Sequence, residues 1–234
     1  MELWQNETAK YNARLKSIKN WNVDLPNFMR KLPDSPFKGE PPVEKAVAVT
    51  IVWFTAGGCV RYADQCVKAF MKLWESGLFS TITLPARLIY ELWASTHYAL
   101  RVLDDVKDSK NLERAHKRTQ QLFLGARSDL TLPWGDIPAP KCIHIMDFVR
   151  SLSNVYPETQ DTYSFLCESC HPSYVQLMNW SLAGPPNDNW SNPNLQRIAH
   201  NLIDRTLTAM EMSLSGICED TTNAFNTASI YFEM

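Results

Sequence analysis

Cys167, Cys170 and His171 form the pattern C-x-x-C-H in the second half of the chain. Two thiols at this spacing, followed by histidine, are typical of c-type haem attachment. We expect no haem, because such attachment belongs to exported proteins and the N-terminus lacks the basic and apolar regions of a secretory signal. One motif also offers too few clustered ligands for a structural zinc site. The favoured interpretation is structural thiols without a cofactor or metal, and a redox dithiol stays an alternative.

A second group of reactive side chains combines residues of the helix predicted at 83–106 with residues of the segment before Pro172. Arg87 and Glu91 are four residues apart in an apolar segment, so they must face water or pair inside the protein. If buried, they can bind Tyr163 or His171 from the helix that ends before Pro172. Two interpretations stay open: an ion pair that fixes helix register, or a catalytic site. The predicted site residues are Arg87, Glu91, Tyr163, Glu168 and His171.

Basic residues and tryptophans supply two candidate binding surfaces. Arg114, Lys117 and Arg118 lie on one face of a predicted helix, where they either contact phosphate groups or form a solvated surface. Trp180 and Trp190 lie in a long loop, residues 180–193, and loops of this length are often functional. These tryptophans are candidates for docking a protein partner or a second copy of the chain.

Other side chains that could do chemistry stand alone. His97, His144 and His200 have no neighbouring ligand types in the sequence, so we expect them to serve packing. The chain contains no G-x-S-x-G, P-loop, Rossmann glycine pattern or H-E-x-x-H. These absences argue against the common hydrolases, nucleotidases, dehydrogenases and zinc proteases.

Composition limits the class of protein. The chain has 234 residues, 45% of them hydrophobic and only eight of them glycine, which favours helices over a turn-rich β fold. Its formal net charge of −2 gives no overall attraction to nucleic acid or anionic lipid. The longest run without charge, residues 46–60, is short for a membrane span. We expect a cytoplasmic protein with reduced cysteines and no membrane association.

The apolar spacing predicts an all-α, mostly antiparallel bundle of about six or seven helices in one domain, residues 1–234. A proline-rich connecting segment is expected at residues 22–42. Gly57 and Gly58 suggest a kink, or a junction of two helices, within residues 43–76. The predicted helices span residues 1–20, 43–76, 83–106, 109–124, 142–154, 159–171 and 194 onward.

Two segments together resemble a known group of proteins. The helix Ala86-Arg87-Leu-Ile-Tyr-Glu91 and the later Tyr163-x-x-Leu-Cys-Glu168-x-x-His171-Pro172 resemble uncharacterised bacterial helical proteins grouped near the HEPN superfamily. The resemblance covers about residues 45–175. It implies an all-α bundle in which the arginine, the glutamate and the histidine meet.

The resemblance also implies alternatives for function. HEPN ribonucleases cut RNA without metal and carry arginine and histidine at a fixed spacing on one helix. That spacing is absent here, since Arg197 and His200 are too close and Arg87 and His97 too far apart. The favoured hypothesis is therefore a non-catalytic HEPN-like interaction module that binds a protein or itself. The alternative is a metal-independent ribonuclease, or an RNA- or nucleotide-binding protein, of a defence or toxin–antitoxin system. In the ribonuclease, Arg87 would hold phosphate and His171 would transfer a proton.

Overall fold

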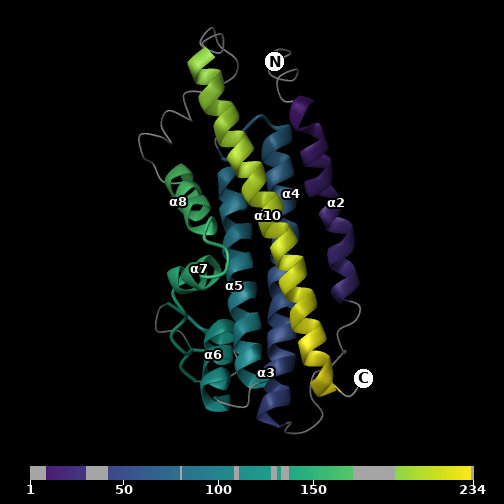
Figure 1. The fold of residues 1–234 in the computed structure, drawn as a ribbon, viewed down its shortest axis with the longest axis vertical. Coiled ribbons are helices and arrows are strands. Elements are labelled where there is room, and N and C mark those ends of the chain that lie inside the picture. Colours follow the sequence, from purple (N-terminus) through teal and green to yellow (C-terminus); the bar gives the residue numbers. More distant parts are fainter. Residues whose placement is uncertain are drawn as a thin grey trace.

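The protein is an all-α bundle, as the sequence predicts. The computed structural model describes residues 9–29, 42–79, 81–107, 111–127, 131–132, 137–170 and 193–232. Within these ranges there is no β-strand, and only two isolated bridges occur, Ala126 with Lys141 and Thr131 with Pro138. The long helices run along the longest axis of the molecule, and shorter ones cover one side of it (Figure 1).

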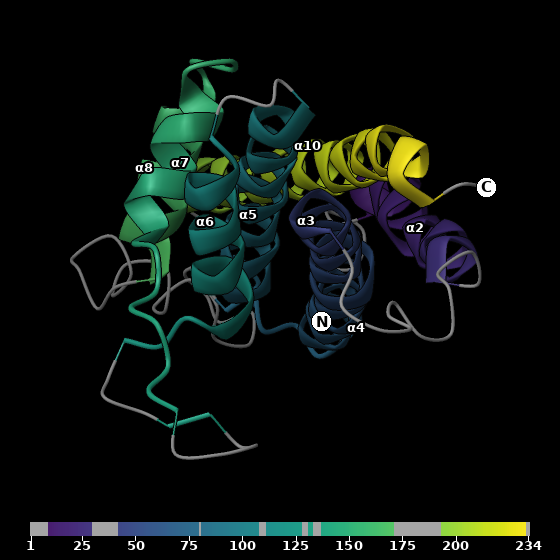
Figure 2. The same ribbon diagram turned by 90° about the horizontal axis from the view of Figure 1, so that it is seen from below.

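The described residues form one short 3₁₀ turn and eight α-helices. A short 3₁₀ turn, Ala9–Tyr11, precedes the first α-helix. The α-helices are α2 (Asn12–Met29), α3 (Val43–Val52), α4 (Arg61–Glu75), α5 (Thr83–Lys107), α6 (Leu112–Leu124), α7 (Ile145–Ser153), α8 (Thr159–Cys170) and α10 (Pro193–Phe232). Seen from below, α6, α7 and α8 lie on one side of α5, and α2 lies on the far side of the bundle (Figure 2).

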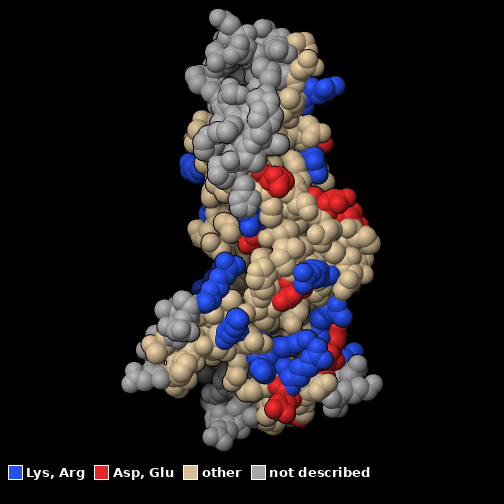
Figure 3. Space-filling model, turned by 90° about the vertical axis from the view of Figure 1, so that its left-hand side faces the viewer, with Lys and Arg blue, Asp and Glu red and all other residues tan. Residues whose placement is uncertain are grey.

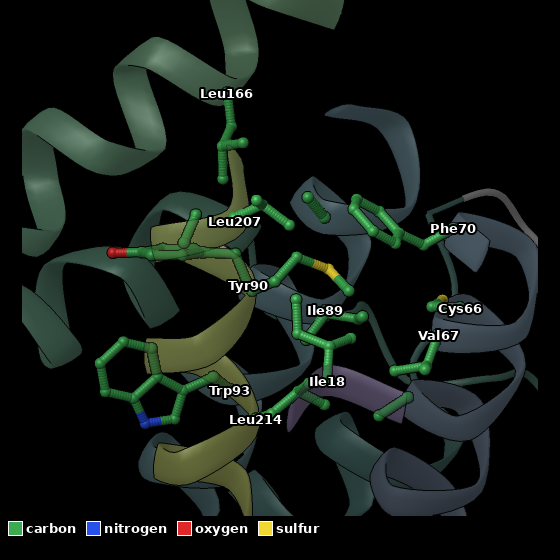
Figure 4. Packing of buried hydrophobic residues seen from close by; sticks show 14 of the residues in the cluster. Ile18, Cys66, Val67, Phe70, Ile89, Tyr90, Trp93, Leu166, Leu207 and Leu214 are labelled. Carbon is green, nitrogen blue, oxygen red and sulfur yellow. The ribbon is translucent and has the colours of Figure 1, made fainter. Parts of the chain in front are cut away.

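The core centres on α5 and α10, which form the most extensive helix–helix interface. Ile89, Tyr90 and Trp93 of α5 belong to the same buried cluster as Leu207 and Leu214 of α10, shown in Figure 4. Burying a large apolar side chain contributes about 1.5–3 kcal/mol, so this cluster is the main source of stability. It holds α5 as a rigid support for the helices that pack on its outer side.

Residues 43–75 form one continuous helical segment with a local change of winding. The π-helical stretch Trp53–Val60 contains Gly57 and Gly58 and joins α3 to α4. The expected junction at the glycine pair is therefore present as a π-helix. Gly77 ends the segment with φ of 71°, a conformation that glycine adopts without strain.

By length and composition, the segment Val43–Glu75 is apolar enough to cross a membrane, with a mean hydropathy of 1.4 in its best window. Half of that window is buried inside the protein. Val47, Ile51, Val67 and Phe70 are fully buried among the other helices. The segment thus acts as a core helix of the bundle.

The prediction of a connecting segment at residues 22–42 is wrong for residues 22–29, which are helical. The helix α2 continues through Met29 and includes Pro26. Pro26 lacks the N–H that would bind the carbonyl four residues earlier, but its fixed φ is helical, so the backbone continues as a helix for three more residues. Residues 30–41 lie outside the described residues, as do residues 1–8 of the predicted first helix. The helices predicted at 83–106, 142–154 and 159–171 match α5, α7 and α8 to within a few residues.

Candidate functional site

Arg87, Glu91 and Tyr163 meet between α5 and α8. Arg87 Nε donates a hydrogen bond to Glu91 Oε1 at 3.0 Å, and the Tyr163 hydroxyl donates to the same oxygen at 3.0 Å. The Arg87 guanidinium also lies 5.8 Å from the centre of the Tyr163 ring. Arg87 and Glu91 keep 27% and 23% of their side-chain surface exposed, so these two side chains are reachable from solvent, whereas Tyr163 is buried.

Burial and neighbouring charges shift the acidities of this group. Burial, followed by the charge of Glu91, raises the pKa of Tyr163 well above its ordinary value. Burial opposes the charge on Arg87, but Cys167 and Glu91 favour it and raise its pKa. Burial also raises the pKa of Cys170, although Thr83 and Arg87 act in the opposite direction. The arginine stays charged, and the tyrosine and this thiol are held neutral at physiological pH.

This cluster holds α8 against α5. The Tyr90 hydroxyl adds a 2.6 Å hydrogen bond to the carbonyl of Thr159, and the Tyr90 and Tyr163 rings stack at 5.6 Å. Glu168 lies exposed on α8. His171, the predicted proton-transfer residue, lies outside the described residues, as do Trp180, Trp190 and the loop around them.

A cluster of four arginines lies lower on the same side of the bundle. It lines a pocket of about 420 Å³ bordered by α5, α6 and α7. We call this site the arginine pocket. Its described lining residues are Tyr98, Arg101, Val102, Asp105, Arg114, Arg118, Asp147, Arg150, Ser151 and Asn154. Figure 3 shows Lys and Arg side chains gathered over the lower half of this face.

The arginines are held in different ways. Arg101 donates to the Ser151 hydroxyl at 3.3 Å. Arg118 pairs with Asp105 at 3.4 Å and lies 5.6 Å from the centre of the Tyr98 ring. Arg150 pairs with Asp147 at 3.3 Å.

Arg114 has no such partner. Across the ranges that the structure describes, it forms no hydrogen bond or ion pair. In the pocket, neighbouring side chains orient Arg101, Arg118 and Arg150. Arg114 is the one of the four that has no such partner among the described residues.

The sequence predicts two of the four arginines that line this pocket. Arg114 and Arg118 are among the predicted binding residues, whereas Lys117 is exposed on α6 and does not line the pocket. Arg87 and Arg101 lie on the same helix but belong to different sites, because Arg101 lines this pocket and Arg87 contacts the Tyr163 ring. Arg150 was not predicted. No sequence signal joins it to α6, since only the packing of α7 on α5 brings the two together.

The opposite face of α6 lines a different, apolar pocket. It also measures about 420 Å³ and includes Val47, Trp53, His116 and Phe123 among its walls. This pocket lies against α3, so α6 separates an apolar hollow from the basic one.

The isolated histidines serve local structure. His97 is buried with its Nδ1 atom 3.4 Å from Asp220 Oδ2 on α10. His144 caps α7 by accepting a hydrogen bond from the backbone N–H of Met146 at 3.2 Å. His200 contacts the Tyr11 hydroxyl at 3.1 Å. All six cysteines are free thiols, and the described residues contain no group of three His, Cys, Asp or Glu side chains arranged to hold a metal.

Comparison with known proteins found no matching protein family, no similar curated protein and no similar solved structure.

Proposed function

We propose that the protein binds the phosphate groups of a nucleotide or RNA in the arginine pocket and does not cleave them. The observation that carries this proposal is the convergence of four guanidinium groups from three helices on one pocket of about 420 Å³. Guanidinium groups bind phosphate oxygens in pairs through parallel N–H donors, which makes arginine the preferred residue for planar recognition of phosphate.

The bundle supports this role by fixing the donors in advance. Arg101 lies on α5, the central helix, and Arg150 on α7, which packs against α5. A binding site on packed helices loses less conformational entropy when it binds than one on a loop. The two carboxylates of the lining pair with Arg118 and Arg150, so they orient donors and are not placed to act as general bases.

Two further points belong to the proposal. We place the protein in the cytoplasm, which six free cysteines support because thiols persist in reducing compartments. We also keep the HEPN-like relationship as a proposal, with RNA binding in a defence system as the role that the arginine pocket would serve. Docking of a protein partner through Trp180 and Trp190 concerns residues outside those described, and nothing in the described ranges favours it.

The ribonuclease alternative rests on a different observation. Arg87, Glu91 and the buried Tyr163 form a group in which a guanidinium and a hydroxyl share one carboxylate oxygen. Such a group can hold a phosphate, but proton transfer would depend on His171. The two functions therefore predict different variants that lose activity.

The test is calorimetric titration with adenosine 5′-monophosphate and with a short single-stranded RNA. We compare the wild-type protein with Arg114→Gln and with Lys117→Gln as a matched control on the same helix. We expect Arg114→Gln to weaken both ligands by about tenfold or more, which corresponds to about 1.4 kcal/mol. Lys117→Gln should change the affinity less than about twofold, because Lys117 does not line the pocket.

The same RNA is also incubated with the protein in EDTA, with His171→Ala as a second variant. We expect the RNA to stay intact with both proteins. Cleavage that disappears in His171→Ala would favour the ribonuclease alternative. Equal binding by wild-type protein and Arg114→Gln, or no binding by either, would contradict the arginine pocket as the site.

A further inference from the structure

We infer that the arginine pocket selects a terminal phosphate, a phosphate monoester, over an internal phosphodiester. This inference rests on the proposed function and names its ligand class: a nucleoside monophosphate or the phosphorylated end of an RNA. Its basis is the balance of fixed charges and donors in the pocket.

The charges of the lining match a dianion. The four arginines exceed the two aspartates by two, so the described lining has a formal charge of +2. A phosphate monoester has a charge of about −1.5 to −2 at neutral pH. A phosphodiester has a single negative charge, so it leaves part of the positive charge uncompensated. The charged side chains of the lining are partly exposed, Arg150 to 71%, so salt screens part of this difference and low ionic strength shows it most clearly.

Asp105 and Asp147 set the net positive charge of the pocket. Each aspartate pairs with one arginine at 3.3–3.4 Å, and together they leave the equivalent of two positive charges for the ligand. A dianion gains about twice as much as a monoanion from each positive charge, so the pocket favours the monoester, and removal of either carboxylate should strengthen that preference.

The donors of the pocket also fit a terminal phosphate. A terminal phosphate presents three oxygens that carry charge, whereas a diester presents two. Arg114 makes no hydrogen bond or ion pair within the described ranges, so no described side chain uses its N–H donors. Arg101 donates one hydrogen bond to the Ser151 hydroxyl, which leaves its other N–H groups for a ligand. Three oxygens can therefore be bound without breaking either ion pair of the lining.

The inference predicts a specific pH dependence, and the ligand is its source. The charged or titratable groups around the pocket are Tyr98, Arg101 and Asp105 on α5, Arg114 and Arg118 on α6, and Asp147 and Arg150 on α7. The described lining contains no histidine, the side chain whose ordinary pKa lies nearest to neutral. The dianion of a phosphate monoester takes up one proton near pH 6, and the resulting monoanion resembles a diester in charge.

The experiment compares adenosine 5′-monophosphate with adenosine 3′,5′-cyclic monophosphate by calorimetry. Both ligands have the same base and sugar, but the cyclic one is a diester. At about pH 7.5 we expect the monoester to bind about tenfold more tightly or better. At about pH 5.5 its affinity should approach that of the cyclic ligand, whose own affinity changes little.

Asp105→Asn and Asp147→Asn test the origin of the selectivity. Each variant raises the formal charge of the lining to +3, counted from the same residues. We expect both ligands to bind more tightly and the ratio of their affinities to increase by about threefold or more, because an added positive charge attracts the dianionic monoester more strongly than the monoanionic diester. Lys117→Gln should leave the ratio unchanged.

The outcomes separate the inference from the proposed function. Equal affinity for the two ligands at about pH 7.5 would overturn the selectivity and leave phosphate binding intact. Absence of binding by both would overturn both proposals. A preference for the monoester that persists unchanged at about pH 5.5, or in Asp105→Asn, would show that charge balance is not its cause and would also overturn the inference.

Discussion

At the scale of single residues, Gly216 decides how closely α10 approaches α5. A Cβ atom at this position would lie 2.1 Å from Nε1 of Trp93, a distance that no packed structure tolerates. Gly216 therefore allows the indole to lie flat against the backbone of α10. The same contact places His97, one turn further along α5, beside Asp220.

We predict that Gly216→Ala destabilises the protein by about 2 kcal/mol, because overpacking a filled core forces side chains and backbone to shift. Chemical denaturation followed by circular dichroism measures this change. The matched control is Gly58→Ala, since a Cβ there would meet no atom within 4 Å. The control should be neutral or slightly stabilising because alanine favours helix. Equal stability of the two variants would contradict the close approach at Trp93.

The sequence predicts the residues of the α5–α8 contact better than their role. Arg87 and Glu91 were recognised from their spacing on an apolar helix, and Tyr163 from its place in the segment before Pro172. The spacing does not reveal that Glu91 accepts from both Arg87 and Tyr163. That fact depends on the height at which α8 packs on α5, which only the whole fold determines.

At the scale of helices, a charged network attaches α2 to α10. Arg14 donates to Asp204 Oδ1 at 2.6 Å, to Thr208 Oγ1 at 2.9 Å and to Glu211 Oε2 at 2.6 Å. The hydrogen bond and charge of Glu211, with the charge of Asp204, outweigh burial and raise the pKa of Arg14. One guanidinium thus binds three successive turns of α10.

We predict that Arg14→Gln lowers the free energy of unfolding by about 1–2 kcal/mol. The loss is limited because Asp204 is 62% exposed and water replaces part of the interaction. Arg61→Gln, at an exposed position on α4, should change stability by less than about 0.5 kcal/mol. Hydrogen exchange should also become faster in α2 in the first variant. Unchanged stability and exchange would show that apolar contacts alone hold α2.

Helices were the most predictable level of this fold. Long apolar periodicity with few glycines predicts α5 and the continuous segment from α3 to α4, and both are present. The error at residues 22–29 arose because proline is usually a helix breaker. Pro26 lies near the end of α2, where one lost hydrogen bond does not end the helix.

At the scale of the whole molecule, close packing holds several ionisable groups neutral. Burial raises the pKa of Cys59 to about 12, that of Cys66 to about 11 and that of Tyr90 to about 12. In the unfolded chain, the pKa of cysteine is about 8.5 and that of tyrosine is about 10. The folded protein therefore holds these protons more tightly than the unfolded chain does.

We predict that the contribution of Cys59, Cys66 and Tyr90 to stability is constant between about pH 6 and 8 and is lost as the pH rises from about 8.5 towards about 12, because the unfolded state loses these protons first. Melting temperatures across this range measure the effect. Cys66→Ala removes one contributing thiol, so its melting temperature should fall less steeply with pH. Identical slopes for the variant and the wild-type protein would contradict the contribution of this buried thiol.

The arginine pocket exists only at the scale of the whole molecule. Arg114 and Arg118 share a face of α6 that the sequence shows, but Arg101 and Arg150 join them because α6 and α7 both pack against α5. A linear sequence gives no measure of that packing. For this reason the pattern predicts a basic helix face and cannot predict a pocket lined by four arginines.

The most direct test of phosphate binding is a nuclear magnetic resonance titration that observes the Nε–H groups of the arginines. Adenosine 5′-monophosphate is added to the full-length protein, and each signal is assigned by Arg→Lys substitution. We predict shifts at Arg101, Arg114, Arg118 and Arg150, with none at Arg14 or Arg87. Shifts at Arg87 with none at these four would contradict the arginine pocket and place the phosphate between α5 and α8.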